Sequence, residues 1–308
     1  MLQRFRVKTA IIMNQEIAPQ ANINSDALEV KEKPLTRDEL VKIWKEAEET
    51  VIDYPAGTAV DSQGKTYEYA NGVRLWIGNE KEVMDSCQRP WAIETVDKAF
   101  EALGPTKKNV NLLERGFGIG LIAGEAMDHL RRRGGTYTVI ELNDKNYSYA
   151  KEKWLPKQES IEQAKATSEI GGTFTEPKVV TKIIQGDAIK ETEKMASEGK
   201  KFDIIISDTF PLSEDEKSIN DLMDLSTLIK CLNPDGVFAF FGYHSEFQGG
   251  MNEKQRNLLD RTFENVSRTM AKGINPPPDY KYFHPKNGSV VRELPVIICT
   301  KPRIQPEA

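Results

Sequence analysis

The sequence beyond Ala92 alternates short apolar runs with longer amphipathic segments, and this alternation constrains the fold more than any other feature. It predicts strands at 109–113, 137–142, 179–184, 202–207, 236–241, 280–283 and 294–300, and helices at 92–103, 121–132, 144–154, 222–232 and 253–270. Strands that alternate with helices build a parallel sheet covered on both faces. We therefore predict an α/β fold: a doubly wound, mostly parallel seven-stranded Rossmann-like sheet.

The first 80 residues follow a different pattern. Thr36 and Glu39 form a capping box that predicts a helix over 36–52, and turn signals between aromatic residues predict short strands and hairpins over 54–77. The apolar run 9–13 predicts a tail or an edge strand. We thus divide the chain into an N-terminal extension, 1–80, which caps the active site or forms a homodimer contact, and a main domain, 81–308.

Composition excludes several classes of protein. The 308 residues carry 42 basic and 47 acidic side chains, a balance that argues against nucleic-acid binding. No apolar run is long enough for a transmembrane helix, and the N-terminus lacks the features of a signal peptide. Three scattered cysteines and the absence of paired Cys or His motifs predict a cytoplasmic protein that binds neither membrane nor metal.

A glycine-rich turn, LLERGFGIG, joins the first strand of the main domain to a helix. Gly116, Gly118 and Gly120 let the backbone turn tightly and approach a ligand closely. Glu114 precedes them, and its carboxylate would repel the pyrophosphate of a dinucleotide but suit a ligand with ammonium and sulfonium groups. The alternative is a turn without a ligand.

Two more signals follow the next two strands. Glu141 ends the second strand, where an acidic side chain can accept both ribose hydroxyls of an adenosine. Gly186, Asp187 and Ala188 follow the third, where small residues leave room for adenine and Asp187 can accept its amino group. Ligands of open α/β sheets bind at the carboxyl ends of strands, so these residues predict one adenosine site.

Two further carboxylates predict the substrate. Asp208 lies where a buried strand enters a proline-containing loop, and Glu94 lies at the start of the helix that precedes the first strand of the main domain. Two carboxylates that face one cavity suit a guanidinium, which is planar and pairs bidentately. A carboxylate that takes a proton also makes the guanidino nitrogen nucleophilic, because the guanidinium pKa exceeds about 12.

The segments LLERGFGIG, VIELND, QGDA, FDIIISDTFPLSEDE, GVFAFFGYHSE, NPPPDYKYF and LPVIICTKP resemble the guanidinoacetate N-methyltransferases and their relatives that methylate arginine. The resemblance spans about 83–302, and DTFPLSE is its most specific piece. It implies a class I methyltransferase that uses S-adenosylmethionine (SAM). It departs from the family where Ile93 precedes Glu94, in the QGDA segment, and in a polar insert at 157–178.

The resemblance also implies residue roles. Glu94 and Asp208 would hold the guanidino group, and Met84 would pack near the cofactor. The backbone around Tyr243 and His244 would hold the substrate carboxylate.

The sequence therefore predicts a SAM-dependent N-methyltransferase that acts on the guanidino group of a small molecule such as arginine or guanidinoacetate. The alternatives are an aminopropyltransferase of the polyamine-synthase type and a non-catalytic SAM-binding protein. An aminopropyltransferase should carry a second acidic motif for the diamine, which the sequence lacks.

Overall fold

The computed structural model describes residues 35–60, 64–78, 81–168, 178–213, 216, 220–242, 251–280 and 290–303. Residues 36–308 form one compact unit. The expected strand at 9–13 and part of the insert at 157–178 lie outside the described residues.

A seven-stranded sheet forms the centre of the unit, in the order β11-β12-β10-β9-β6-β7-β8. Its strands are β6 (Val110–Arg115), β7 (Gly135–Glu141), β8 (Val179–Gln185), β9 (Phe202–Ser207), β10 (Leu232–Phe240), β11 (Phe263–Lys272) and β12 (Glu293–Pro302). Strands β6 to β10 pair in parallel, and β12 runs antiparallel to both of its neighbours. The predicted doubly wound, mostly parallel seven-stranded sheet is confirmed.

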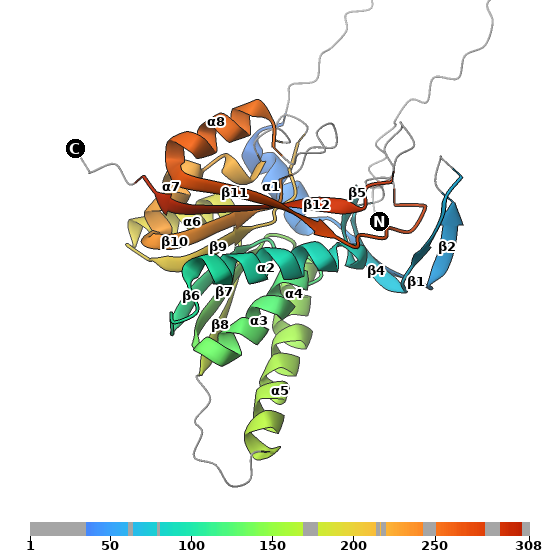
Figure 1. Cartoon of the computed structure of the whole chain (residues 1–308), viewed down its shortest axis with the longest axis horizontal. Coiled ribbons are helices and arrows are strands. Elements are labelled where there is room, and N and C mark those ends of the chain that lie inside the picture. Colours follow the sequence, from blue (N-terminus) through green and yellow to red (C-terminus); the bar gives the residue numbers. More distant parts are fainter. Residues whose placement is uncertain are drawn as a thin grey trace, which may run out of the picture. The chain divides into compact units, whose positions relative to one another are not determined.

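Helices cover both faces of this sheet (Figure 1). They are α2 (Arg89–Leu103), α3 (Leu121–Arg133), α4 (Asp144–Tyr149), α5 (Leu155–Ser168), α6 (Ala188–Ser197), α7 (Leu225–Leu228) and α8 (Glu253–Thr262), with the short turns η1 (Ser86–Gln88), η3 (Asn220–Leu222) and η4 (Ile229–Cys231) and the π-helical turn η2 (Ala150–Trp154). One apolar core lies under α2 and α3, and a second under α6, α7 and α8. The apolar strands are buried on both faces, as β9 shows with every residue buried.

The N-terminal part holds α1 (Arg37–Glu46) and two small antiparallel sheets. Strands β1 (Glu49–Tyr54), β4 (Gly72–Ile77) and β5 (Lys81–Asp85) form one sheet, and β2 (Gly57–Val60) pairs with β3 (Thr66–Tyr69). The Thr36–Glu39 capping box is present and begins α1 as predicted. The helix ends at Glu46, however, because the chain turns into β1 three residues later.

One strand near the C-terminus was predicted as part of a helix. The expected helix at 253–270 ends at Thr262, and β11 follows directly over Phe263–Lys272. This strand is the edge of the sheet and buries only Phe263 and Ala271 fully, so its polar sequence hides the strand pattern. The expected strand at 280–283 is not seen at Tyr280, and its other residues lie outside the described ones. The expected helix at 222–232 is broken into short turns around α7.

Candidate active site

A cavity opens at the carboxyl ends of the central strands, and it brings together most of the residues that the sequence predicted. Met84, Gly116, Gly118, Glu141, Gly186, Asp187, Ala188 and Asp208 all line it. They come from β5 and from the loops after β6, β7, β8 and β9, as the position of ligand sites in open α/β sheets requires.

The glycine loop forms the floor of this cavity, and its backbone permits only glycine at two positions. Gly116 has φ of 88°, and a Cβ there would lie 2.4 Å from the carbonyl oxygen of Asp208. Gly118 has φ of 54°, and a Cβ there would meet the Met84 sulfur at 2.7 Å. Met84 Sδ also accepts from the backbone N–H of Ile119 at 3.4 Å. Met84 therefore packs on the loop, as expected, and the loop leaves its open side to the cavity.

Glu141 lies at the end of β7, and its carboxylate is held by backbone donors. Oε2 accepts from the N–H groups of Phe117 and Gly118 at 3.0 and 3.2 Å, and Oε1 accepts from Asn143 N–H at 2.8 Å. Burial nevertheless raises the pKa of Glu141, although these hydrogen bonds oppose the shift. Burial raises the pKa of Glu49 to about 7, and the negative charge of Glu141 makes a smaller contribution to this shift. Glu141 thus ties the glycine loop to β7 while it lines the cavity.

Asp187 caps α6 and has an unused oxygen. Its Oδ1 accepts from Ile189 N–H at 3.1 Å and from Arg37 Nη2 at 3.0 Å. Its Oδ2 is buried without a hydrogen-bond partner among the described residues. A buried carboxylate oxygen without a partner is costly, so this atom marks a place where a donor of a ligand would bind.

Asp208 follows β9 beside the glycine loop. Its N–H donates to the carbonyl of Arg115 at 2.9 Å, which fixes the start of the loop. Burial, and secondarily the charge of Asp221, raise the pKa of Asp208 to about 8. Asp221 holds the next residue, since it accepts from both the N–H and the hydroxyl of Thr209 at 3.1 and 2.7 Å. The backbone of Asp208 is therefore held against the glycine loop, and the pKa of its carboxyl group is well above the usual value.

Several predicted residues do not line the cavity. Glu114 is 1% exposed and accepts from the Tyr137 hydroxyl at 2.5 Å, and burial raises its pKa well above the usual value. Gly120 begins α3 with φ of 75°, against the ring of Phe117. Glu114 and Gly120 therefore belong to the glycine-rich turn but do not line the cavity. Tyr243 and His244 lie outside the described residues.

Glu94 is not brought to the cavity either. Helix α2 begins at Arg89, earlier than expected, so Glu94 lies in its second turn and off the buried face. The pKa of Lys98 is raised chiefly by Glu101, and Glu94 adds a smaller electrostatic contribution from the same helix. Gln88, just before α2, lines the cavity instead, and its Oε1 accepts from Asp85 N–H at 2.8 Å. The lining thus contains the neutral amide of Gln88 but not the carboxylate of Glu94.

The N-terminal extension was expected to cap the site or to form a dimer contact, but the residues of this wall of the cavity were not named in advance. Arg37 and Trp44 of α1 line it, and the indole N–H of Trp44 donates to the carbonyl of Leu212 at 3.2 Å. The Trp44 ring packs against Phe210 with centroids 5.3 Å apart. The capping box predicted the helix, but no local signal shows which distant loop a helix contacts. Tyr280 and Phe241 complete the apolar part of the lining.

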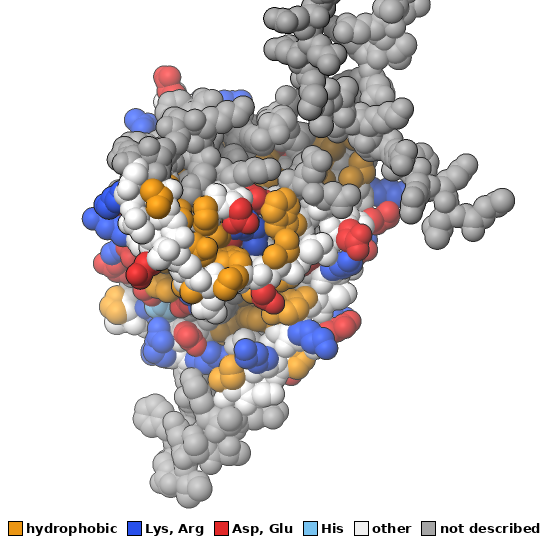
Figure 2. Space-filling model, turned by 90° about the vertical axis from the view of Figure 1, so that its right-hand side faces the viewer, with side chains coloured by type: hydrophobic (Ala, Val, Ile, Leu, Met, Phe, Trp, Pro, Cys, Tyr) orange, Lys and Arg blue, Asp and Glu red, His pale blue; other side chains and the backbone are white. Residues whose placement is uncertain are grey.

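Figure 2 shows the face where acidic and basic side chains lie close together among hydrophobic ones. Within the described part of the chain, no group of three His, Cys, Asp or Glu residues is arranged to hold a metal ion. None of the helices in the described ranges is long and apolar enough to cross a membrane.

No protein-family model and no curated protein matches the chain. Among solved structures, the spermidine synthase of Thermotoga maritima is 11% identical with a TM-score of 0.49, over 83% of this chain and 82% of its own. A probable spermidine synthase from Corynebacterium glutamicum is 17% identical with a TM-score of 0.45, over 81% and 79%. Human methyltransferase-like protein 13, in complex with SAH, is 14% identical with a TM-score of 0.36, over 72% and 83%. The fold assignment therefore rests on the strand order of the sheet.

Proposed function

We propose that the protein is a SAM-dependent transferase that methylates a guanidino nitrogen of a small molecule. The observation that carries the proposal is Asp208, a partly buried carboxyl group beside the glycine loop whose pKa is raised to about 8. Such a group gains a cation as its counter-charge and can accept the proton that a guanidinium must lose.

The cavity fits the adenosine part of SAM. Asp187 offers its unused Oδ2 to an exocyclic amino group, and Glu141 presents a carboxylate where ribose hydroxyls would bind. Gly116 and Gly118 keep the floor free of side chains. When bound, SAM supplies an electrophilic methyl group on a sulfonium.

The residues around Asp208 would position the substrate and remove its proton. Phe241 and Tyr280 line the cavity with apolar surface, which lowers the local dielectric and strengthens the attraction between Asp208 and a cation. Holding the nitrogen in line with the methyl group contributes orientation, worth up to about 7–11 kcal/mol. Because Glu94 is absent from the lining, we assign the counter-charge of the substrate to Asp208, and Gln88 adds only a neutral contact.

A methyl-transfer assay with guanidinoacetate and arginine side by side tests the proposal. The wild type should methylate one of them, and Asp208→Asn should lower turnover by about 10²–10⁴ while leaving cofactor affinity nearly intact. Glu94→Gln is the matched control, since it removes a carboxylate outside the cavity. Substantial activity of Asp208→Asn would remove both the general base and the main argument for a guanidine.

An aminopropyltransferase is the second candidate, and the charge of the cavity favours it. The lining carries five carboxylates, Glu82, Glu141, Asp187, Asp208 and Glu216, against the two arginines Arg37 and Arg115. Decarboxylated SAM lacks the carboxylate of SAM and would meet less repulsion there. Titration with both cofactors separates the candidates: tighter binding of decarboxylated SAM, with transfer to a diamine, supports the second. Binding without transfer to any acceptor would indicate a non-catalytic SAM-binding protein.

A further inference from the structure

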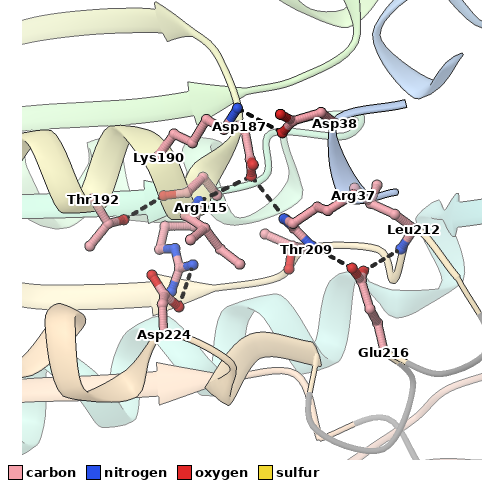
Figure 3. A network of polar contacts seen from close by, with 12 residues as sticks. Arg37, Asp38, Arg115, Asp187, Lys190, Thr192, Thr209, Leu212, Glu216 and Asp224 are labelled. Atoms are coloured by element: carbon pink, nitrogen blue, oxygen red, sulfur yellow. Dashed lines mark hydrogen bonds and ion pairs between the residues drawn. The ribbon is translucent and has the colours of Figure 1, made fainter. Parts of the chain in front are cut away.

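The side chain of Arg37 lies between two loops of the site. Its Nη2 donates to Asp187 Oδ1 at 3.0 Å, and its Nη1 donates to Glu216 Oε1 at 2.5 Å. Figure 3 shows the guanidinium between these carboxylates, at the start of α1. Glu216 in turn accepts from Leu212 N–H at 2.9 Å. Arg37 therefore joins the loop after β8 to the loop after β9, although Arg37 and Asp187 are 150 residues apart.

The pair of Arg37 and Asp187 is an incomplete fork. Arginine and carboxylate commonly form two parallel hydrogen bonds, but here only one is formed. The remaining donor, Arg37 Nε, and the remaining acceptor, Asp187 Oδ2, are both buried and have no partner among the described residues. Both residues line the cavity. A buried donor and a buried acceptor on two hydrogen-bonded side chains of the lining are thus both left without a partner among the described residues.

We propose that Arg37 and Asp187 together read the edge of adenine that carries the amino group. On this edge, an amino group that donates lies next to the ring nitrogen N1, which accepts. The amino group would donate to Asp187 Oδ2, and N1 would accept from Arg37 Nε. Arg37 is then a specificity-determining residue supplied by the N-terminal segment. This inference rests on the proposed cofactor site and extends it.

The arrangement also gives α1 a role in the cofactor site. Trp44 contacts Leu212 and Phe210, and Asn143 Nδ2 donates to the backbone carbonyls of Trp44 and Ala47 at 3.1 and 3.0 Å. These contacts fix the helix that carries Arg37 against the loops after β7 and β9. A fixed helix presents Arg37 in a defined position, which selective recognition of a base requires.

Calorimetric titration with adenosine and 1-deazaadenosine tests the inference, because the second compound lacks only the N1 acceptor. The wild type should prefer adenosine about tenfold, the usual effect of one lost hydrogen bond to a charged group. Arg37→Met, and also Arg37→Lys, should bind adenosine more weakly and lose the preference. Lys190→Met is the matched control and should keep the preference. It removes an exposed ion pair between α6 and α1, in which Lys190 Nζ lies 2.9 Å from Asp38 Oδ1.

The outcomes separate the inference from the proposed function. If Arg37→Met weakens both nucleosides equally and keeps the tenfold preference, Arg37 only supports the fold and the inference is wrong. If the wild type binds S-adenosylhomocysteine but shows no preference between the nucleosides, the inference is likewise wrong and the cofactor site stands. Failure of the wild type to bind S-adenosylhomocysteine at all would refute the cofactor site, and the role of Arg37 with it.

Discussion

Binding of a guanidinium beside Asp208 should release a proton at neutral pH. The pKa of Asp208 is raised to about 8 by burial and by Asp221, so the free protein holds this carboxyl mostly protonated at pH 7. A cation requires the ionised form, because only a carboxylate offers it a counter-charge. Ionising Asp208 at pH 7 costs about 1.4 kcal/mol, so the affinity should be roughly tenfold weaker than above pH 9.

The sign of the effect follows from the raised pKa. Affinity should rise about tenfold per pH unit below pH 8 and level off above it, with about 0.9 proton released per guanidinium bound at pH 7. Titration of guanidinoacetate or arginine into the protein saturated with S-adenosylhomocysteine, in buffers of different ionisation enthalpy, measures that number directly.

Asp208→Asn is the control for this prediction. It should bind the guanidine more weakly and release no proton, whereas Glu94→Gln should behave as the wild type. If the wild type shows no proton release between about pH 6 and pH 8, or if the release persists in Asp208→Asn, the assignment of the titrating group is wrong.

Three other measurements give separate tests. Glu141→Gln should weaken SAM binding by about 1–3 kcal/mol in a calorimetric titration, since a charged acceptor of ribose hydroxyls is lost, and an unchanged dissociation constant would remove the ribose assignment. Asp208→Asn should stabilise the protein more at pH 9 than at pH 5, by up to a few kcal/mol in urea unfolding. The reason is that the raised pKa of Asp208 makes its ionisation destabilising as the pH rises toward and through about 8. Equal stabilisation at both pH values would speak against the raised pKa. Trp44→Ala should lower the free energy of unfolding by about 3–5 kcal/mol, since a side chain 6% exposed leaves a cavity beside Leu212 and Phe210; a loss below about 1 kcal/mol would mean that α1 is not firmly packed.

The sequence predicted the central sheet well because its strands are buried on both faces. Phe202–Ser207 reads as a continuous apolar run, and the structure places β9 there without a shift. The edge strand β11 was missed for the opposite reason: most of its side chains face solvent, so its composition resembles the polar helix before it. The pattern of apolar residues therefore indicates which segments are buried, and it does not by itself identify a strand.

The site was predictable where its residues follow strand ends in order. Asp187 and Asp208 could be placed together because parallel strands carry their carboxyl ends to one edge. Gln88 was missed because the exact start of a helix decides whether residue 88 or 94 faces the cavity. Arg37 was missed because its partners lie 150 and 179 residues away, and no local pattern encodes such a contact.

The identity of the transferred group tests the central claim most directly. The protein is incubated with SAM and arginine or guanidinoacetate, and the product is analysed by mass spectrometry with fragmentation. We expect one methyl group on a guanidino nitrogen, formed by the wild type and by Glu94→Gln but at most at a trace level by Asp208→Asn. Absence of methylation by the wild type, together with aminopropyl transfer from decarboxylated SAM to a diamine, would contradict it.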